Sequence, residues 1–167
     1  TAKPTVAERP GVPHHLLDLA VGHERAVHAR DLAAARHVEH VALTQQLFAA
    51  LLAQGEGIVL PMLQRLGKEP LPLRNQVNEA LAKLPHAYGS EARLSRELNK
   101  VIDEADAARA ELTDEYLSTE HLLLALAGQL DLDREQLLTA LQSVRGSHRV
   151  TSQNPEEQYQ ALEKYGR

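Results

Sequence analysis

The chain has 167 residues, enough to bury one hydrophobic core, and carries 18 Lys and Arg against 23 Asp and Glu, a formal net charge of -5. This balance excludes the basic surface that binding to nucleic acid or an anionic membrane needs, and the lack of cysteine excludes disulfides, thiolate catalysis and cysteine zinc sites. The apolar residues are mainly Leu and Ala, which favours helices. With no apolar run of about 18 residues and no export signal, we expect a cytoplasmic protein.

The first 18 residues predict a flexible lead-in, because Pro4, Pro10, Gly11 and Pro13 interrupt helix formation there. The following residues, 19–146, form a series of helical patterns of about 10 to 18 residues, separated by Gly and Pro. No strand-like alternation persists along them. We therefore predict a single all-α domain.

Most of the histidines lie early in the chain, in the stretch before Val41. His37 and His40 are three residues apart and could share a helix face as zinc or nickel ligands. Because no H-E-x-x-H motif or cysteine pair accompanies them, we interpret them as ordinary solvated side chains and predict no metal site. A metal-dependent enzyme or metal sensor that uses these histidines is the alternative from a different functional class.

The chain contains an internal repeat. When it is shifted by 75 residues, TQQLFAALLA (Thr44–Ala53) lies on TEHLLLALAG (Thr119–Gly128), and the preceding segment Arg25–Val41 lies on Lys100–Tyr116 without a gap. The two copies cover residues of about 19–88 and 94–146. We predict two tandem, pseudo-symmetric helical repeats.

The second repeat is shorter than the first. Beyond the first match the best shift falls from 75 to 60 residues, where QVNEALAKL (Gln76–Leu84) lies on QLLTALQSV (Gln136–Val144). The second copy therefore lacks about fifteen residues, those that correspond to Gly55–Glu69 in the first. We predict that one helix is missing from it and that the chain has about seven helices.

Two segments of the second repeat predict different degrees of burial. The segment 94–112 carries its apolar residues on one helical stripe opposite charged ones, which indicates a helix on the surface of a core. The next, YLSTEHLLLALAG (Tyr116–Gly128), is apolar all round after its first turn, which is typical of a central buried helix. Ser118 is well placed as its N-cap, and Glu120 in the first turn interacts favourably with the helix dipole.

Catalysis finds little support in the sequence. Glu120 and His121 point about 100° apart on a helix, so they do not form an acid-base pair by themselves. The chain has no G-x-x-x-x-G-K-[ST] phosphate loop and no G-x-S-x-G motif. We therefore expect no enzymatic activity and no cofactor in this chain.

Asp114 and Glu120 flank a turn between the two predicted helices. The simpler interpretation is that Asp114 and its neighbours form a solvated acidic loop. The alternative is that both carboxylates lie at the rim of an apolar surface, where they bind backbone amides or basic side chains of an extended peptide.

These features together resemble a known family. Two helical repeats with an EHLLLAL-type helix are similar to the Clp amino-terminal domain of Hsp100 AAA+ chaperones, and the tail RVTSQNPEEQYQALEKYGR (Arg149–Arg167) resembles the ClpB subfamily. The resemblance covers about Val41–Arg167. It implies that residues 147–167 are a linker leading toward an ATPase module, with a short helix at about 156–164.

The resemblance implies a non-enzymatic domain that binds exposed apolar segments of misfolded or aggregated proteins and passes them to a hexameric ATPase ring. ATP and magnesium would belong to the ATPase modules, and the isolated domain would be a monomer. Asp114 and Glu120 fall on acidic positions that the family associates with substrate binding, and Ile102 falls on an apolar one. Docking of folded adaptors, as in ClpA or ClpC, is the alternative binding function.

This chain departs from the family pattern in its first repeat. Ala20 stands where the family has a Thr that opens the first helix, and the sequence ALTQQ (Ala42–Gln46) replaces the favoured acid-His pair. The missing fifteen residues of the second repeat also leave one face of its core to be covered differently. We expect the family's groove to be altered.

Overall fold

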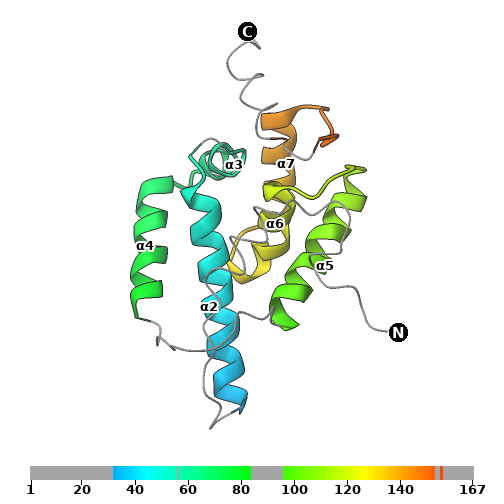
Figure 1. Ribbon diagram of the computed structural model, residues 1–167. Coiled ribbons are helices and arrows are strands. Elements are labelled where there is room, and N and C mark those ends of the chain that lie inside the picture. The colour runs from blue at the N-terminus through cyan, green and yellow to red at the C-terminus, as the bar shows by residue number, and fades with distance from the viewer. Residues whose placement is uncertain (1–31, 56, 84–95, 153–154, 156–167) are drawn as a thin grey trace, which may run out of the picture.

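The computed structural model describes residues 32–55, 57–83, 96–152 and 155, with side chains from Leu43 onward (Figure 1). These residues form six α-helices and one short 3-10 helix, and no strand occurs among them, which confirms the all-α prediction. The helices are α2 (Leu32–Ala53), α3 (Val59–Arg65), α4 (Pro70–Ala82), α5 (Arg96–Glu111), α6 (Thr119–Leu126) and α7 (Arg134–Arg145), with the 3-10 helix η2 (Ala127–Gln129) after α6.

Several predictions from the sequence fall outside the described residues. These are the lead-in at 1–18, the start of the first repeat at 19–31, most of the linker at 147–167 and the short helix at about 156–164. The side chains of His37 and His40 also lie outside the described part of the chain.

The order of the helices follows the two repeats. The first repeat contributes α2, α3 and α4, and the second contributes α5, α6 and α7. Helix α3 lies within the fifteen residues that the second repeat lacks, and there α6 and α7 are separated only by η2 and a four-residue loop, 130–133. The predicted loss of one helix is therefore accounted for by α3.

Helix α2 is longer than the sequence pattern predicted. It runs for 22 residues without a break, whereas the second repeat divides the corresponding stretch between α5 and α6. In the shifted alignment, the cap Ser118 corresponds to Leu43 and Thr113 corresponds to Val38. A Leu side chain offers no oxygen to cap a helix start, and a Val strongly resists positive φ, so the first repeat has no signal that ends the helix.

The core lies around α6. Helix α6 packs on α5, α2, α7 and α3, and its leucines Leu122, Leu123, Leu124 and Leu126 are each at most 3% exposed. This confirms the prediction of a central buried helix. Each fully buried Leu contributes about 1.5 to 3 kcal/mol relative to an exposed one, so α6 is a main source of the domain's stability.

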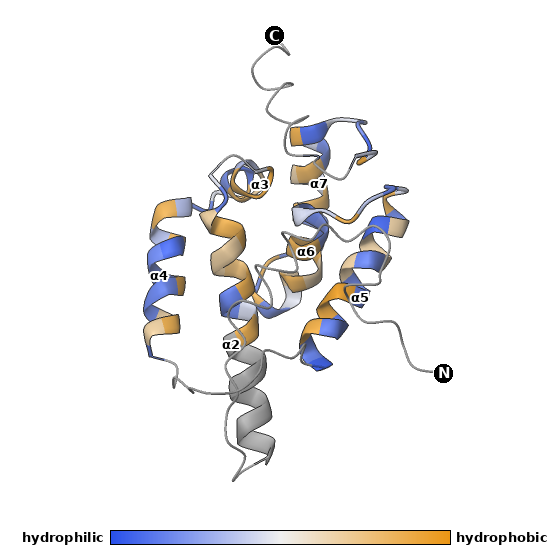
Figure 2. Cartoon of the chain, in the orientation of Figure 1, coloured by the Kyte–Doolittle hydropathy of each residue, from blue (hydrophilic) through white to orange (hydrophobic). Residues whose placement is uncertain are grey.

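Helix α5 has the two faces that its sequence predicted. It buries Leu98, Val101, Ile102, Ala105 and Ala108. In Figure 2 hydrophilic and hydrophobic bands alternate along α5, as expected for a helix with one apolar face. Among the described residues no helix is both long and apolar enough to cross a bilayer.

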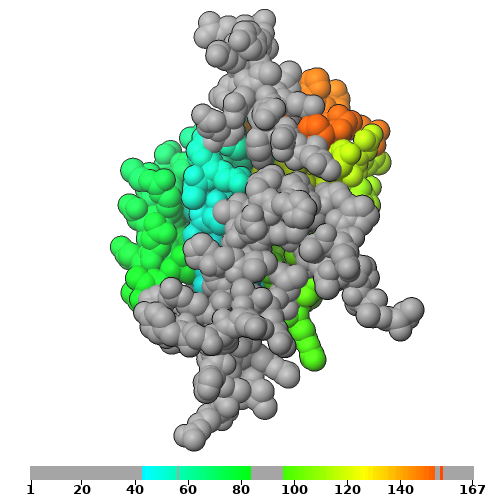
Figure 3. Space-filling view, viewed as in Figure 1, coloured from blue at the N-terminus to red at the C-terminus, as the bar shows by residue number. Residues whose placement is uncertain are grey.

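Helix α4 lies at the edge of the domain. It packs mainly on α2, on the side away from α5 (Figure 1), and it forms one flank of the surface in Figure 3. Only Val77 of α4 is buried, while Leu71 is 60% exposed.

Candidate functional site

The loop between α5 and α6 carries the predicted site, and its geometry begins with the end of α5. Thr113 has φ 58°, and the amides of Thr113 and Asp114 donate to the carbonyls of Ala110 and Arg109 at 3.1 and 3.0 Å. These two bonds form a Schellman motif, in which the left-handed residue is usually Gly. A β-branched Thr in this conformation is strained by on the order of 1 to 3 kcal/mol. The loop is therefore held by contacts beyond its own backbone.

Asp114 provides the main contacts. Its carboxylate accepts three hydrogen bonds: Oδ2 accepts from His121 Nε2 at 2.9 Å and from Arg145 Nη1 at 2.8 Å, and Oδ1 accepts from the Val150 amide at 2.9 Å. Asp114 is 3% exposed and Arg145 is 7% exposed. One carboxylate thus joins the loop to α6, to the end of α7 and to the segment after α7.

Glu120 extends this arrangement along the first turn of α6. Its Oε1 accepts from Arg145 Nη1 at 3.2 Å, its Oε2 accepts from the Ser118 hydroxyl, and the residue is 0% exposed. Arg145 therefore neutralises two buried carboxylates, and as a cation in the last turn of α7 it also interacts favourably with the helix dipole. We refer to Asp114, Ser118, Glu120, His121 and Arg145 as the buried polar cluster.

The hydrogen bonds of His121 identify the tautomer of its ring. Its Nδ1 accepts a hydrogen bond from the Ser118 amide at 2.9 Å, so the ring proton is on Nε2, which donates to Asp114. Ser118 is the N-cap of α6, as the sequence predicted, and the ring of His121 supplies the returning half of a capping box.

The cluster contains a Ser, a His and an Asp, but their geometry differs from that of a nucleophilic triad. Ser118 Oγ is 3.4 Å from His121 Nδ1, yet the hydroxyl donates to Glu120 and Nδ1 already accepts from the backbone. The histidine therefore does not serve as a base for the hydroxyl. No group of three potential metal ligands occurs among the described residues.

The pKa of Asp114 results from opposing effects. Burial acts to raise it, but the hydrogen bonds from His121, Val150 and Arg145, with the charge of Arg145, outweigh burial and hold the pKa below its usual value. A carboxyl whose pKa is lower in the folded state stabilises the fold above its unfolded pKa of about 3.9. This stabilisation is lost as the pH falls through the folded pKa.

Asp114→Asn is expected to remove this dependence on pH. The difference in unfolding free energy between the unaltered chain and the variant should be constant from neutral pH down to about 5 and should shrink below about 4. Urea unfolding over a pH series measures it.

A suitable control is Glu111→Gln. The hydrogen bond and charge of Arg134 also lower the pKa of Glu111, but this carboxylate is exposed and solvent screens it, so the pH-dependent difference should be smaller. A difference for Asp114→Asn that stays constant through the acid range would contradict the role assigned to Asp114.

The structure contradicts one part of the site prediction. The carboxylates of Asp114 and Glu120 are buried, so they do not form an exposed rim. Both accept hydrogen bonds from Arg145, which is the partner that allows their burial. Ile102, at 3% exposed, is part of the core. Whether these three residues engage a substrate stays a prediction.

Sequence reasoning missed Arg145 and Val150. Arg145 follows Leu137 and Leu141 at intervals of four residues, so it falls on the apolar stripe of α7 that faces the core. A cation on such a stripe is a signal of a buried partner. The role of Val150 has no such signal, because its backbone amide makes the contact.

Comparison with known proteins gives consistent results at the level of family and of fold. Residues 23–142 match the family described as the Clp repeat (R) N-terminal domain. The chain is 45% identical over 132 residues, 71% of its length, to "Chaperone protein ClpB" of Mycobacterium leprae. It is 36% identical over 146 residues, 80% of its length, to "Chaperone protein ClpB 1" of Synechococcus elongatus.

The two ClpB relatives are much longer than this chain, which aligns with 15% and 17% of their lengths. Among solved structures, the Hsp104 N-terminal domain from Candida albicans matches with a TM-score of 0.59 and 19% sequence identity, over 84% of this chain and 93% of that one. At that identity the likeness concerns the fold alone.

Proposed function

The chain belongs to the Clp repeat N-terminal domain family, and from this premise we propose that it is the substrate-binding domain of a ClpB-type disaggregase in the cytoplasm. It engages exposed apolar segments of misfolded or aggregated proteins weakly and passes them to a hexameric ring. ATP and magnesium are bound by ATPase modules elsewhere in that protein. The observation that carries the proposal is the extent of identity with the ClpB relatives.

Two partly exposed side chains with apolar groups lie on the loop before α6, beside the buried polar cluster. Leu112 and Tyr116 lie on this loop on either side of Asp114, and both are partly exposed. We assign the direct contact with a bound peptide to these two side chains. The contact is transient, because an unfolded segment loses conformational entropy when it is ordered on a small surface.

Asp114, Glu120 and Ile102 act in this proposal as positioning residues. Asp114 and Glu120 hold the loop and the first turn of α6 through Arg145, and Ile102 is part of the core on α5, which packs against α6. Their burial favours this role over direct contact with the peptide.

Leu112→Ala combined with Tyr116→Ser is expected to weaken binding of an unfolded protein by about tenfold, equivalent to about 1.4 kcal/mol. The physical reason is the loss of the apolar contact area on the loop. Fluorescence anisotropy of labelled casein, titrated with the 167-residue chain, measures the affinity. Circular dichroism establishes that the variant is folded.

Leu71→Ser is the matched control, because Leu71 is an exposed leucine on α4, on the far side of α2. It should leave the affinity for casein unchanged. An equal loss in the control would place binding elsewhere, and binding of a folded adaptor without binding of casein would favour the adaptor-docking function.

The positioning role has its own readout. Glu120→Gln keeps the shape of the side chain and a hydrogen-bond acceptor for Arg145, so it should retain more affinity than Glu120→Ala. A folded variant with both Asp114→Ala and Glu120→Ala whose affinity for casein is unchanged would show that neither residue contributes.

A further inference from the structure

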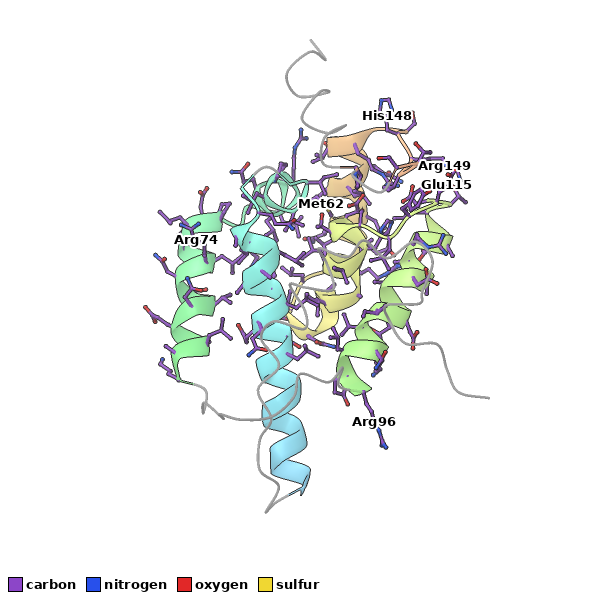
Figure 4. The ribbon with its side chains drawn as sticks, viewed as in Figure 1. Met62, Arg74, Arg96, Glu115, His148 and Arg149 are labelled. Carbon is purple, nitrogen blue, oxygen red and sulfur yellow. The ribbon has the colours of Figure 1, made fainter. Side chains whose placement is uncertain are left out.

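The chain turns back onto the α5–α6 loop directly after α7. Gly146 ends α7 with φ 63°, and its amide donates to the Gln142 carbonyl at 2.9 Å. Four residues later Val150 is 0% exposed, although His148 and Arg149 before it are exposed. Figure 4 shows His148 and Arg149 at the same end of the molecule as Glu115 of the α5–α6 loop.

Both backbone polar groups of Val150 bind this loop. The Val150 amide donates to Asp114 Oδ1 at 2.9 Å, and the Val150 carbonyl accepts from the Glu115 amide at 2.9 Å. The guanidinium of Arg149 also donates to the Thr113 carbonyl. Three consecutive loop residues therefore hold two residues that lie more than thirty positions later in the chain.

We propose that Asp114 is a clasp for the chain after α7: it fixes Val150 to the loop before α6, so that the two open and close as one unit. The clasp is defined as the contacts of Asp114 and Glu115 with Val150. It holds residues 149 and 150 against the α5–α6 loop. This role does not depend on peptide binding, so either proposal can fail while the other stands.

The two oxygens of Asp114 give this clasp its specific requirement. Oδ2 accepts from His121 and Arg145 while Oδ1 accepts from Val150. An Asn at this position has one oxygen, for which Arg145 and the backbone amide of Val150 compete. The charged guanidinium of Arg145 forms the stronger hydrogen bond. The amino group of the Asn then faces the Val150 amide, which is donor against donor. If burial of the Val150 side chain alone held the segment after α7, Asp114→Asn would not affect the position of that segment.

Spin-label distances test the clasp in the 167-residue chain. The chain has no cysteine, so Lys100→Cys on α5 and Thr151→Cys, both at exposed positions, give a single labelled pair. Double electron–electron resonance should show one narrow distance distribution. Asp114→Asn should replace it with a broad one, and a distribution that stays narrow in the folded variant overturns the proposal.

Glu120→Gln is the matched control. Glu120 shares Arg145 with Asp114, and its carboxylate accepts from Ser118 at the start of α6 and from Arg145 at the end of α7. The labelled control should keep the narrow distribution. Equal broadening in the control would mean that the cluster loosens as a whole, and would also overturn the clasp.

Hydrogen exchange keeps the proposal testable if Asp114→Asn does not fold. In the unaltered chain the amides of Val150 and Glu115 should exchange at rates within about tenfold of each other, because a unit that opens as a whole has one opening free energy. Exchange of the Val150 amide that is faster than that of Glu115 by more than about tenfold would show that the segment opens alone, which contradicts the clasp.

Discussion

Arg145→Met is expected to lower the free energy of unfolding by about 3 to 5 kcal/mol, because removing one partner of a buried ion pair leaves the other uncompensated. Here two carboxylates lose their cation at once, since Arg145 donates to both Asp114 and Glu120. Both carboxylates are at most 3% exposed, so water does not replace the lost partner without disturbing the packing. Urea unfolding at neutral pH measures the change.

Arg134→Met is the control for this experiment. Arg134 pairs with Glu111, and both side chains are largely exposed, so its loss should change stability little. A second test adds Glu120→Gln to Arg145→Met, which removes one of the two uncompensated charges. The double variant should lose less than the sum of the single ones. Equal losses for Arg145→Met and Arg134→Met would contradict the assignment of Arg145 as the central cation.

Leu123→Ala is expected to destabilise the domain by about 2 to 5 kcal/mol, the range for a buried Leu that leaves a cavity. Leu123 is 0% exposed on α6, and α6 packs on four other helices, α2, α3, α5 and α7. A cavity among several rigid neighbours collapses poorly, so the loss should lie toward the upper part of this range. Thermal and urea unfolding both measure it.

Leu71→Ala makes the same chemical change on the surface. Leu71 is 60% exposed at the start of α4, so its truncation should cost less than about 0.5 kcal/mol. A loss for Leu123→Ala of less than about 1 kcal/mol would mean that α6 is not the centre of the core.

The sequence was sufficient to predict the helices and their relative burial. Hydrophobic periodicity distinguished the one-sided stripe of α5 from the all-round apolar surface of α6, and the structure confirms both. The internal repeat predicted the order of the helices and the region, now α3, that the second copy lacks. Hydrophobic periodicity is present in a short window of the chain, and the repeat follows from comparing two such windows.

The environment of the charged residues could not be predicted in the same way. A loop that contains Asp114 is usually solvated, and its burial depends on Arg145, 31 residues later, and on the Val150 amide, 36 residues later. Such contacts follow from the packing of α7 and of the segment after it. The uninterrupted length of α2 was also missed. The repeat suggested a break as in the second copy, but the first copy lacks the residues that end one helix and begin the next.

The buried polar cluster also has a consequence for how the domain folds. If α6 docked on α5 before α7 arrived, Asp114 and Glu120 would enter an apolar surrounding without their cation, at a high cost in free energy. We therefore expect α6 and α7 to dock in one kinetic step, without a stable half-folded form of the second repeat. On this expectation, closing the loop of some thirty residues between Asp114 and Arg145 contributes to the folding barrier.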